Sequence, residues 1–525
     1  MFDLLLGPRR FGRAKARPYI CRVRLADRRF SSCRRVRSIV TNSVKLVVLL
    51  GLVFAIFCGC SKPPTNPAIA VTHVTVVDAT GAPARPDMTV LIANHLIAAV
   101  GPSQSLSVPR DAQIVDGGGK FLIPGLVDSH LHLTGSGEPE GSREFVVPLL
   151  LANGITTVRD MGGYLESLVP LRRDIQQGKR LGPQIFFAGP YLDGSPPSFQ
   201  PSLVVSNAVE ASEDVHTLVQ QGVDFIKVQS ILDRDAYFAI AQAARREHIT
   251  FVGHVPDRVT AAEASDAGQK SIEHLTGVLR GCSSDEPRLM REQFRAGAKN
   301  ATPESSHARE MAWERELLQT YSDKQCAALL AKFVHNETWQ VPTLILLRND
   351  AYPGPETDSP SDPLLQFVPH TIAAKWQQVR VAQDRLAARA DFVLREKLLA
   401  HSMQVVSQLQ TGGVHILAGT DSAAPYIIPG FSLHQELALL VEAGLSPMQA
   451  LQAATNNPTA FLGKSKTQGT VEAGKTADLL LLDGNPLEDI RNTQKIRAVV
   501  LRGKLIDRAA LDGLLSSVEK FAAAN

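Results

Sequence analysis

Eight short apolar runs alternate with segments of helical periodicity between residues 121 and 465, and this alternation restricts the possible folds more than any other feature. The runs are LVDSHLHL (126–133), ITTVRDMG (155–162), QIFFAG (184–189), FIKVQS (225–230), ITFVGHV (249–255), SIEHL (271–275), TWQVPTLIL (338–346) and VHILAGTDS (414–422). Strands that alternate with helices indicate βαβ units around a parallel sheet. We therefore expect an α/β fold, a TIM-type (β/α) barrel over residues 121–465, with functional residues at the C-terminal ends of its strands.

Short β-rich runs separated by turn signals flank this region on both sides, over residues 68–120 and 466–510. Because both regions have the same pattern of short β-rich runs and turns, we expect the two chain ends to pair into one small discontinuous β-sandwich domain. Residues 60–67, which include SKPPTNP, form a Pro-rich linker, and residues 511–525 form a C-terminal tail.

The N-terminal region, residues 1–59, has the profile of an export signal with a basic extension. Residues Leu46–Phe57 are apolar, follow a basic stretch, and are too few to span a bilayer comfortably. The sequence AIFCGCSK resembles a bacterial lipoprotein cleavage site with an acylated Cys60. We therefore expect an exported protein, a periplasmic or cell-envelope lipoprotein of a bacterium. The alternative is an uncleaved N-terminal membrane anchor.

Charge is distributed unevenly along the chain. Residues 1–45 hold 13 Lys and Arg and two acidic residues, which leaves 42 of the 55 basic residues and 50 of the 52 acidic residues downstream. The folded part therefore has a net charge of −8, which argues against nucleic acid as a partner. A small-molecule substrate is expected instead, and a homo-oligomer is compatible with the sequence.

After Cys60 only Cys282 and Cys326 remain. Two cysteines make neither a disulfide scaffold nor a cysteine-ligated zinc site, so metal ligands must be His and carboxylate. Whether the two cysteines pair is left open, because sequence does not show that they meet.

The sequence PGLVDSHLHL carries the strongest chemical signal. Side chains alternate between the faces of a strand, so His130 and His132 point to the same side and can meet one metal ion. An isolated HxH usually marks only a half-exposed strand. Here the pair follows a Pro-Gly turn at the entry to the barrel, which favours a metal site.

Three more residues end apolar runs at positions where a barrel displays ligands: His254, His274 and Asp421. Taken alone, each histidine is more often a core residue, and Asp421 is more often a turn or cap residue. Their joint occurrence with the HxH pair indicates one site at the barrel mouth.

Lys227 lies within an apolar strand, where an unpaired ammonium group is costly to bury. A salt bridge to Asp224 or to another acidic residue is the structural interpretation. The functional interpretation is a carbamate, formed with carbon dioxide, that bridges two cations.

With these motifs, the segment from about 70 to 510 resembles the amidohydrolase superfamily, in its imidazolonepropionase-like and metal-dependent dipeptidase (prolidase-like) branch. The resemblance implies that His130, His132 and Asp421 bind the more buried metal ion, that His254 and His274 bind the second, and that carbamylated Lys227 bridges both. It implies two divalent ions, zinc by expectation, and it makes Asp421 the catalytic proton shuttle. The sequence QSILDRD after Lys227 departs from the glycine-rich pattern of the dipeptidase-like members.

The function that follows is metal-dependent hydrolysis of an amide C–N bond in a dipeptide or N-acyl amino acid, because two cations activate a water molecule and polarise the carbonyl. Arg159 and His434 are candidate substrate contacts or, equally, structural polar residues at the rim. The alternatives are a cyclic-amide hydrolase or deaminase, a lactonase or phosphotriesterase, and a catalytically inactive surface binding protein.

Two long connections, 278–325 and 349–410, interrupt the regular alternation of strands and helices, and both are candidates to cover the mouth of the barrel. Within the second, residues 370–410 have the periodicity of one extended barrel helix.

Overall fold

The computed structural model describes residues 68–134, 142–296, 302–352, 362–422 and 424–525. The predicted signal or anchor region, the linker and Cys60 lie outside the described residues. Within the described ranges, no helix combines the length and the apolar character needed to cross a bilayer.

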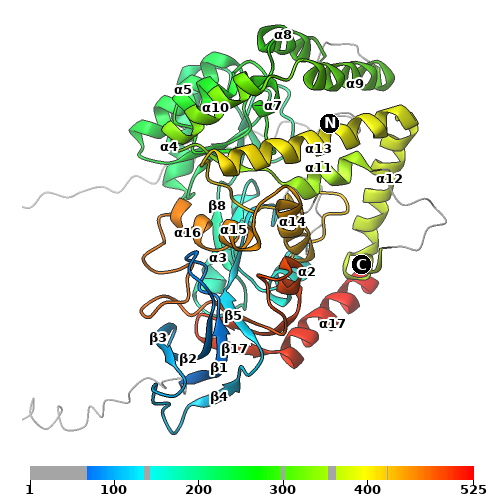
Figure 1. Ribbon diagram of the computed structural model, residues 1–525. Helices are drawn as coiled ribbons and strands as arrows, with labels where there is room; N and C mark the ends of the chain where they lie inside the picture. Colours follow the sequence, from blue (N-terminus) through cyan, green and yellow to red (C-terminus); the bar gives the residue numbers. More distant parts are fainter. Residues whose placement is uncertain (1–67, 135–141, 297–301, 353–361, 423) are drawn as a thin grey trace, which may run out of the picture. The chain divides into compact units, whose positions relative to one another are not determined.

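One sheet is built from both ends of the chain, as predicted (Figure 1). Its strands are β1 (Ile69–Val76), β2 (Arg85–Ala93), β3 (Leu96–Pro102), β4 (Gln113–Asp116), β5 (Phe121–Pro124), β15 (Leu479–Leu482), β16 (Ile496–Leu501) and β17 (Lys504–Asp507). Their order is β17-β16-β15-β5-β1-β2-β3, and β4 pairs with β1. Strand β5 joins the two halves, because it runs parallel to β1 and antiparallel to β15. Alternate residues of these strands form a separate apolar core that includes Val71, Val90, Leu122, Leu479 and Val500.

Two details of the predicted domain bounds differ in the structure. Residues Phe121–Pro124 were expected in the barrel, but their hydrogen bonds to β15 place them in the small sheet. The expected C-terminal tail is helix α17 (Arg508–Ala524), which begins where the Asp507 carboxylate accepts the Ala510 N–H. This helix packs against α2 and buries Leu511 and Val518, so it is part of the fold.

Seven of the eight predicted apolar runs form parallel strands of an α/β barrel. The strands are β6 (Leu126–Leu131), β7 (Ile155–Asp160), β8 (Gln184–Phe187), β11 (Ile226–Val228), β12 (Phe251–Gly253), β13 (Ser271–Glu273) and β14 (Trp339–Val341). They fall into two sheets, β6-β7-β8 and β10-β9-β11-β12-β13-β14. Two short strands that were not predicted, β9 (Tyr191–Asp193) and β10 (Ser202–Val204), follow β8 in the chain and belong to the second sheet. Every residue of β6 and β7 is buried, as expected for strands covered on both faces.

The eighth run, 414–422, makes single bridges rather than a regular strand. Ile416 pairs with Gln340 of β14, and Ser422 pairs with Leu131 of β6. The segment therefore lies between the last strand and the first, which brings Asp421 beside the end of β6. On the other side of β6-β7-β8, the Asp224 N–H donates to the Phe187 carbonyl at 2.9 Å and links β8 to the chain entering β11.

Helices follow the strands and cover them. They are α2 (Ser142–Ala152), α3 (Leu165–Gln176), α4 (Ala208–Gln220), α5 (Arg234–Arg246), α6 (Ala261–Asp266), α7 (Val278–Gly281), α8 (Glu286–Ala296), α9 (Pro303–Gln319), α10 (Asp323–His335), α11 (Leu344–Ala351), α12 (His370–Leu386), α13 (Arg389–Thr411), α14 (Phe431–Glu442), α15 (Pro447–Ala453), α16 (Asn456–Phe461) and α17, with the 3-10 turns η1 (Pro363–Phe367) and η2 (Ile490–Gln494). Polar side chains determine where several of them begin, because the side chains of Asn207, Thr260, Ser322 and Ser446 accept N–H groups of the first turn.

The single helix expected over 370–410 is two helices, so that expectation was wrong. Ala387 and Ala388 are both extended between α12 and α13. No Pro or Gly marks the break. Instead, the Asp391 carboxylate accepts the Ala388 N–H at 2.8 Å and lies 3.0 Å from His307 Nε2 of α9. The first turn of α13 is therefore fixed by Asp391, which bonds to the backbone at the break and contacts the distant helix α9.

Candidate metal centre

The HxH pair lies at the end of β6 and converges on one carboxylate, as the strand alternation predicts. His130 Nε2 is 3.2 Å and His132 Nε2 is 3.1 Å from the same atom, Asp421 Oδ1. One donor atom from each of the three residues lies within 4.8 Å of the others, a spacing that a single metal ion can bridge. Gly419 permits the approach, because a Cβ there would lie 2.7 Å from His130 Cβ.

His254 and His274 complete a row of imidazoles across the barrel mouth. The ring centroids are 4.5 Å apart for His130 and His274, and 5.0 Å apart for His254 and His274. His274 and Asp421 both have positive φ, 57° and 60°, in the left-handed region that side chains seldom adopt. Strained backbone of this kind is concentrated at functional sites.

Each of the four histidines has its Nδ1 atom occupied by another part of the protein. The bonds are His130 to Glu273 at 2.9 Å, His132 to the Gly162 carbonyl at 2.9 Å, His254 to Ser230 at 2.8 Å and His274 to Thr343 at 2.7 Å. Such bonds orient an imidazole and present the other nitrogen as a ligand.

The tautomer of His274 follows from its partner. The Thr343 hydroxyl donates its proton to the Pro342 carbonyl at 2.8 Å, so its oxygen accepts from His274 Nδ1–H. The Nε2 atom of His274 therefore carries a lone pair. Burial lowers the pKa of His274 to about 3 and the pKa of His254 well below its usual value, which keeps both rings neutral as metal binding requires.

Lys227 lies in the middle of β11 and is buried, with 1% of its surface exposed. Among the described residues it forms no salt bridge. The predicted alternative partner, Asp224, is bound by Arg172 at 2.7 Å, so that interpretation was wrong. Burial lowers the pKa of Lys227 to about 8, against the opposing effect of Glu273 and Asp421. A Cβ at Gly253 would lie 2.9 Å from Lys227 Cδ, so glycine leaves room for this side chain.

A layer of buried charges beneath the histidines was missed in the sequence. Glu273 holds His130 and accepts two hydrogen bonds from Arg159 Nη2, at 2.9 and 3.0 Å. Burial alone would raise the pKa of Glu273, but Arg159 and His130 hold that pKa well below its usual range. Asp128 accepts the His130 N–H at 3.1 Å, and burial raises its pKa to about 7. The available signals were the acidic residues in VDSHLH and SIEHL.

Asp421 is the carboxylate at the centre of the cluster. Burial favours its neutral form, but the neighbouring imidazoles of His130 and His274, together with hydrogen bonding from His130 and His132, outweigh burial and hold the pKa of Asp421 well below its usual range. The aspartate is therefore ionised. An anionic oxygen between imidazole nitrogens is the donor set that divalent zinc prefers, so these residues fit a metal ion.

Of the two interpretations of Arg159 and His434, the structure favours structural polar residues over substrate contacts, although both lie in the interior and not at the rim. Arg159 is 1% exposed and binds the Ser129 carbonyl and Glu273 below the histidines. His434 is fully buried in α14, where its ring nitrogens meet Thr493 Oγ1 at 3.0 Å and the Asn153 carbonyl at 3.1 Å. Neither side chain reaches the barrel mouth.

Comparison with known proteins agrees with this arrangement. The model of the amidohydrolase family matches residues 121–506, well over half of the chain. An imidazolonepropionase from Pseudomonas savastanoi is 22% identical over 468 residues, which cover 82% of this chain and 94% of that protein. Other curated relatives are matched over only 12–28% of their own length.

Solved structures share the fold. A bottromycin amidohydrolase superposes with a TM-score of 0.67 at 24% identity, over 88% of this chain and 91% of the other. A protein from Bifidobacterium longum, assigned provisionally as a prolidase, superposes with a TM-score of 0.58 at 25% identity, over 87% of this chain and all of the other. These likenesses support a TIM-type barrel joined to a β-sandwich.

Proposed function

The chain belongs to the amidohydrolase family and is a metal-dependent hydrolase, and we propose that it cleaves the amide C–N bond of a dipeptide or an N-acyl amino acid with two zinc ions bound. The observation that carries this proposal is the set of four imidazoles whose Nδ1 atoms are all occupied, grouped around one ionised carboxylate. The prolidase assigned to a structural neighbour supports the same class of substrate.

We propose that His130, His132 and Asp421 hold one ion, that His254 and His274 hold the second, and that carbamylated Lys227 bridges both. The burial that lowers the pKa of Lys227 increases the fraction of neutral amine, which is the form that reacts with carbon dioxide. In that reaction the amine nitrogen bonds to the carbon of carbon dioxide and releases a proton, so the side chain becomes an anion with two oxygens. Loss of the ammonium form removes the cost of an unpaired cation beside the metals.

Bound divalent ions would lower the pKa of a water molecule and polarise the substrate carbonyl. Asp421 is the group of this chain placed to move the proton. Its Oδ1 atom lies at the centre of the cluster, and the carboxylate is ionised, so it has a free oxygen lone pair that could accept a proton and deliver it to the leaving amine. Glu273 and Thr343 keep the imidazoles in orientation throughout.

A screen of the zinc-loaded full chain against dipeptides and N-acyl amino acids tests the proposal, together with a count of bound metal. We expect amide hydrolysis with two zinc ions per chain. Full activity with one zinc ion would favour a cyclic-amide hydrolase or deaminase. Absence of activity on amides and esters with zinc loaded would favour an inactive binding protein.

A further inference from the structure

A cavity of about 190 Å³ adjoins the candidate metal centre beside His274 and Ser230. Its apolar lining consists of Val255, Leu275, Leu279, Trp313, Leu317 and Leu398. Because His274 is a proposed ligand and Ser230 orients another, a substrate held at the metals has one part close to this cavity. This inference therefore rests on the proposed function.

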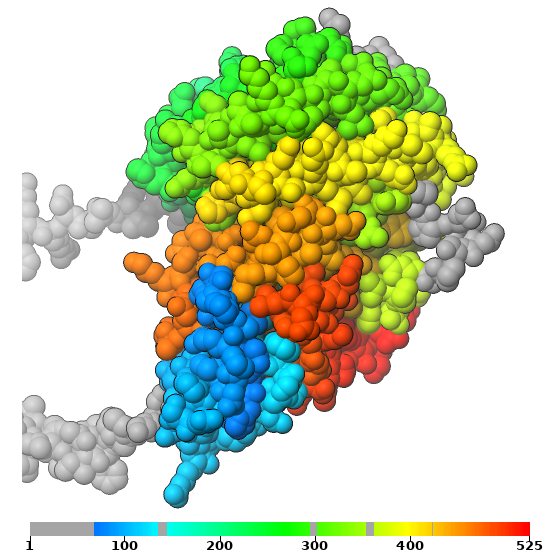
Figure 2. Space-filling view, viewed as in Figure 1, coloured from blue at the N-terminus to red at the C-terminus, as the bar shows by residue number. Residues whose placement is uncertain are grey.

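The wall of the cavity that faces away from the barrel comes from segment 283–325 and from α13. Trp313 and Leu317 lie one turn apart on α9, and Leu398 lies on α13. Helix α9 packs against α13, and Figure 2 shows the green part of the chain against the yellow part. The indole N–H of Trp313 donates to the Leu289 carbonyl of α8 at 3.2 Å. That bond fixes the orientation of the largest apolar group in the lining.

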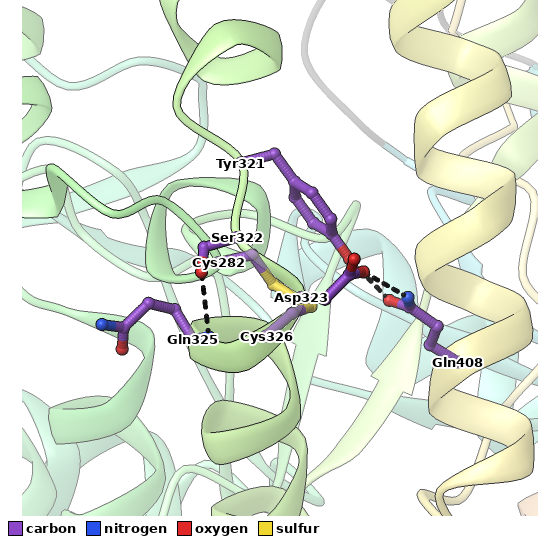
Figure 3. The surroundings of a disulfide bond; sticks show 7 residues. All are labelled: Cys282, Tyr321, Ser322, Asp323, Gln325, Cys326 and Gln408. Carbon is purple, nitrogen blue, oxygen red and sulfur yellow. Dashed lines mark hydrogen bonds between the residues drawn. A yellow bond between two sulfur atoms is a disulfide. The ribbon is translucent and has the colours of Figure 1, made fainter.

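The base of segment 283–325 is closed by a disulfide between Cys282 and Cys326, the two cysteines whose pairing the sequence left open (Figure 3). Beside it, Ser283 bridges Tyr321, and the Ser322 N–H donates to the Cys282 carbonyl at 2.8 Å. The Tyr321 hydroxyl donates to Gln408 of α13 at 2.8 Å. The disulfide thus lies where the segment leaves the barrel, and it restricts the positions that α8 and α9 can take.

The polar groups of the lining are largely engaged with one another. Arg280 donates to the Asp257 carbonyl, to Gln293 and to the Val259 carbonyl, at 3.3, 2.5 and 2.6 Å. Gln293 in turn donates to the Asp257 carboxylate at 2.8 Å. The Glu314 carboxylate lies 3.8 Å from Arg395, and its Oε2 atom accepts no hydrogen bond from the described residues. A substrate carboxylate placed here would meet Asp257 and Glu314 as well as Arg280, and an ammonium group would meet Arg280 as well as the two acids, so neither charge is favoured by all three groups.

We propose that this cavity binds an apolar side chain of the amide substrate, of leucine to phenylalanine size, and that α9, which the Cys282–Cys326 disulfide holds near the barrel, forms the wall that selects this side chain. The size is adequate, because an apolar cavity of about 150 Å³ holds a benzene ring. Burial of such a side chain against the apolar lining supplies the binding energy.

Two substrate series test the occupant, one varied on the acyl side and one on the amine side of the scissile bond, with Gly, Leu, Phe, Glu or Lys at the varied position. In one series we expect kcat/KM for Phe and Leu to exceed that for Gly by roughly 10- to 100-fold, the discrimination an apolar pocket provides. Hydrolysis with equal kcat/KM across both series, or a preference for Glu or Lys, would overturn the inference while the proposed function stands.

If no amide is hydrolysed, the proposed function fails and the cavity is tested by binding alone. Titration calorimetry of the zinc-loaded full chain with N-acetylphenylalanine and N-acetylglycine gives that readout. Tighter binding of the aromatic compound by about tenfold supports the inference, and equal binding overturns it.

Variants locate the effect in the cavity. Trp313→Ala and Leu398→Ala should each lower the ratio of kcat/KM for Phe over Gly by about tenfold, mainly through KM. The matched control is Leu515→Ala in α17, a half-buried leucine outside the cavity, which should leave the ratio unchanged. A ratio that stays constant in Trp313→Ala contradicts the assignment of this wall.

The wall itself is tested by opening the disulfide. The double variant Cys282→Ser and Cys326→Ser should raise KM for the Phe substrate by about tenfold, more than it lowers kcat, with zinc content retained. Reduction of the native chain with a phosphine should reproduce the change, and the same treatment of the variant should add nothing. If the variant does not fold, reduction of the folded native chain decides. An unaltered KM after complete reduction overturns the role of segment 283–325.

Discussion

Two regions of this molecule bury histidine in different ways. At the barrel mouth, His254 and His274 each have one ring nitrogen bonded to a hydroxyl, and among the described residues the other nitrogen makes no hydrogen bond. At the contact between α14 and η2, His434 has both nitrogens bonded, to Thr493 and to Asn153. A fully satisfied histidine stabilises a fold, whereas a half-satisfied one is ready for a ligand.

Of the variants that test this difference between the two regions, Lys227→Ala should have the largest effect on zinc content and activity. Removal of the proposed bridge should abolish binding of most of the metal. The two cations would then have four imidazoles and only one anionic ligand, Asp421, instead of two. Activity should fall by more than the roughly 10- to 100-fold loss that follows removal of a residue that only orients a ligand. Zinc content and kcat/KM provide the measurement, and Lys270→Ala, an exposed lysine paired with Glu337, is the control.

Added acetate or formate gives a second test of the same residue. A small carboxylate can occupy the space of the missing bridge and should restore part of the activity of Lys227→Ala. The proposal for Lys227 fails if this variant keeps two zinc ions and near-normal turnover, or if a zinc-loaded crystal structure shows an unmodified Lys227 away from both metals.

A smaller effect is expected from Glu273→Gln at the same region. The amide keeps the shape of the side chain but removes the charge that orients His130 and pairs with Arg159. Zinc affinity, measured by competition with a chelator, should weaken by about 10- to 100-fold. Glu337→Gln on the surface is the matched control. Unchanged affinity in a folded Glu273→Gln variant would show that the Nδ1 bond does not matter for the ligand.

Lys227 and Glu273 show how much of the site the sequence predicts. The ligands could be predicted because strand alternation and the ends of apolar runs are local patterns, visible in SHLH and in GTDS. Glu273 could not be assigned, since it meets His130 across 143 residues of chain. For the same reason the sequence left the role of His434 open. Its partner Thr493 is 59 residues away and belongs to a turn without a recognisable motif.

The fold shows the same division. Seven strands follow from apolar runs and turn signals. The segment 414–422 is less regular than its sequence suggests, because it is held by single bridges to Gln340 and Leu131. At the break between α12 and α13, Asp391 caps the new helix locally through the Ala388 N–H and also contacts His307, 84 residues away, a contact that the local sequence does not indicate.

His434→Ala should change stability and leave the metal centre intact. Loss of two buried hydrogen bonds together with a cavity costs about 2–4 kcal/mol of unfolding free energy. Zinc content should be unaffected, in contrast to the variants at the barrel mouth. Thermal or urea unfolding measures the difference, with His216→Ala on the surface as control. Loss of zinc in a folded His434→Ala variant would contradict the structural role.

The pH dependence of this histidine gives a further distinction. Burial lowers the pKa of His434 to about 4, below its usual 6.5. The unfolded chain therefore binds a proton at a higher pH than the folded chain does, so the stabilisation is complete above about pH 6.5 and declines as the pH falls toward 4. His434→Gln should remove this part of the acid sensitivity. Equal slopes of unfolding free energy between pH 6.5 and 4.5 in both proteins would argue against a neutral, buried His434.

The smallest expected effect on either region comes from Cys60→Ala, because the role proposed for Cys60 is membrane attachment and not metal binding or core packing. We propose that the chain is exported and anchored by a lipid on Cys60, since a basic region and the short apolar run Leu46–Phe57 precede it. One acyl chain alone binds membranes weakly, so stable attachment would require the multiple acyl chains of a bacterial lipoprotein. In a bacterial host, Cys60→Ala should move the protein out of the lipoprotein fraction and change its processed mass, while zinc content and kcat/KM stay as in the native chain. A variant that remains membrane-bound at the same apparent mass would instead show an uncleaved N-terminal anchor.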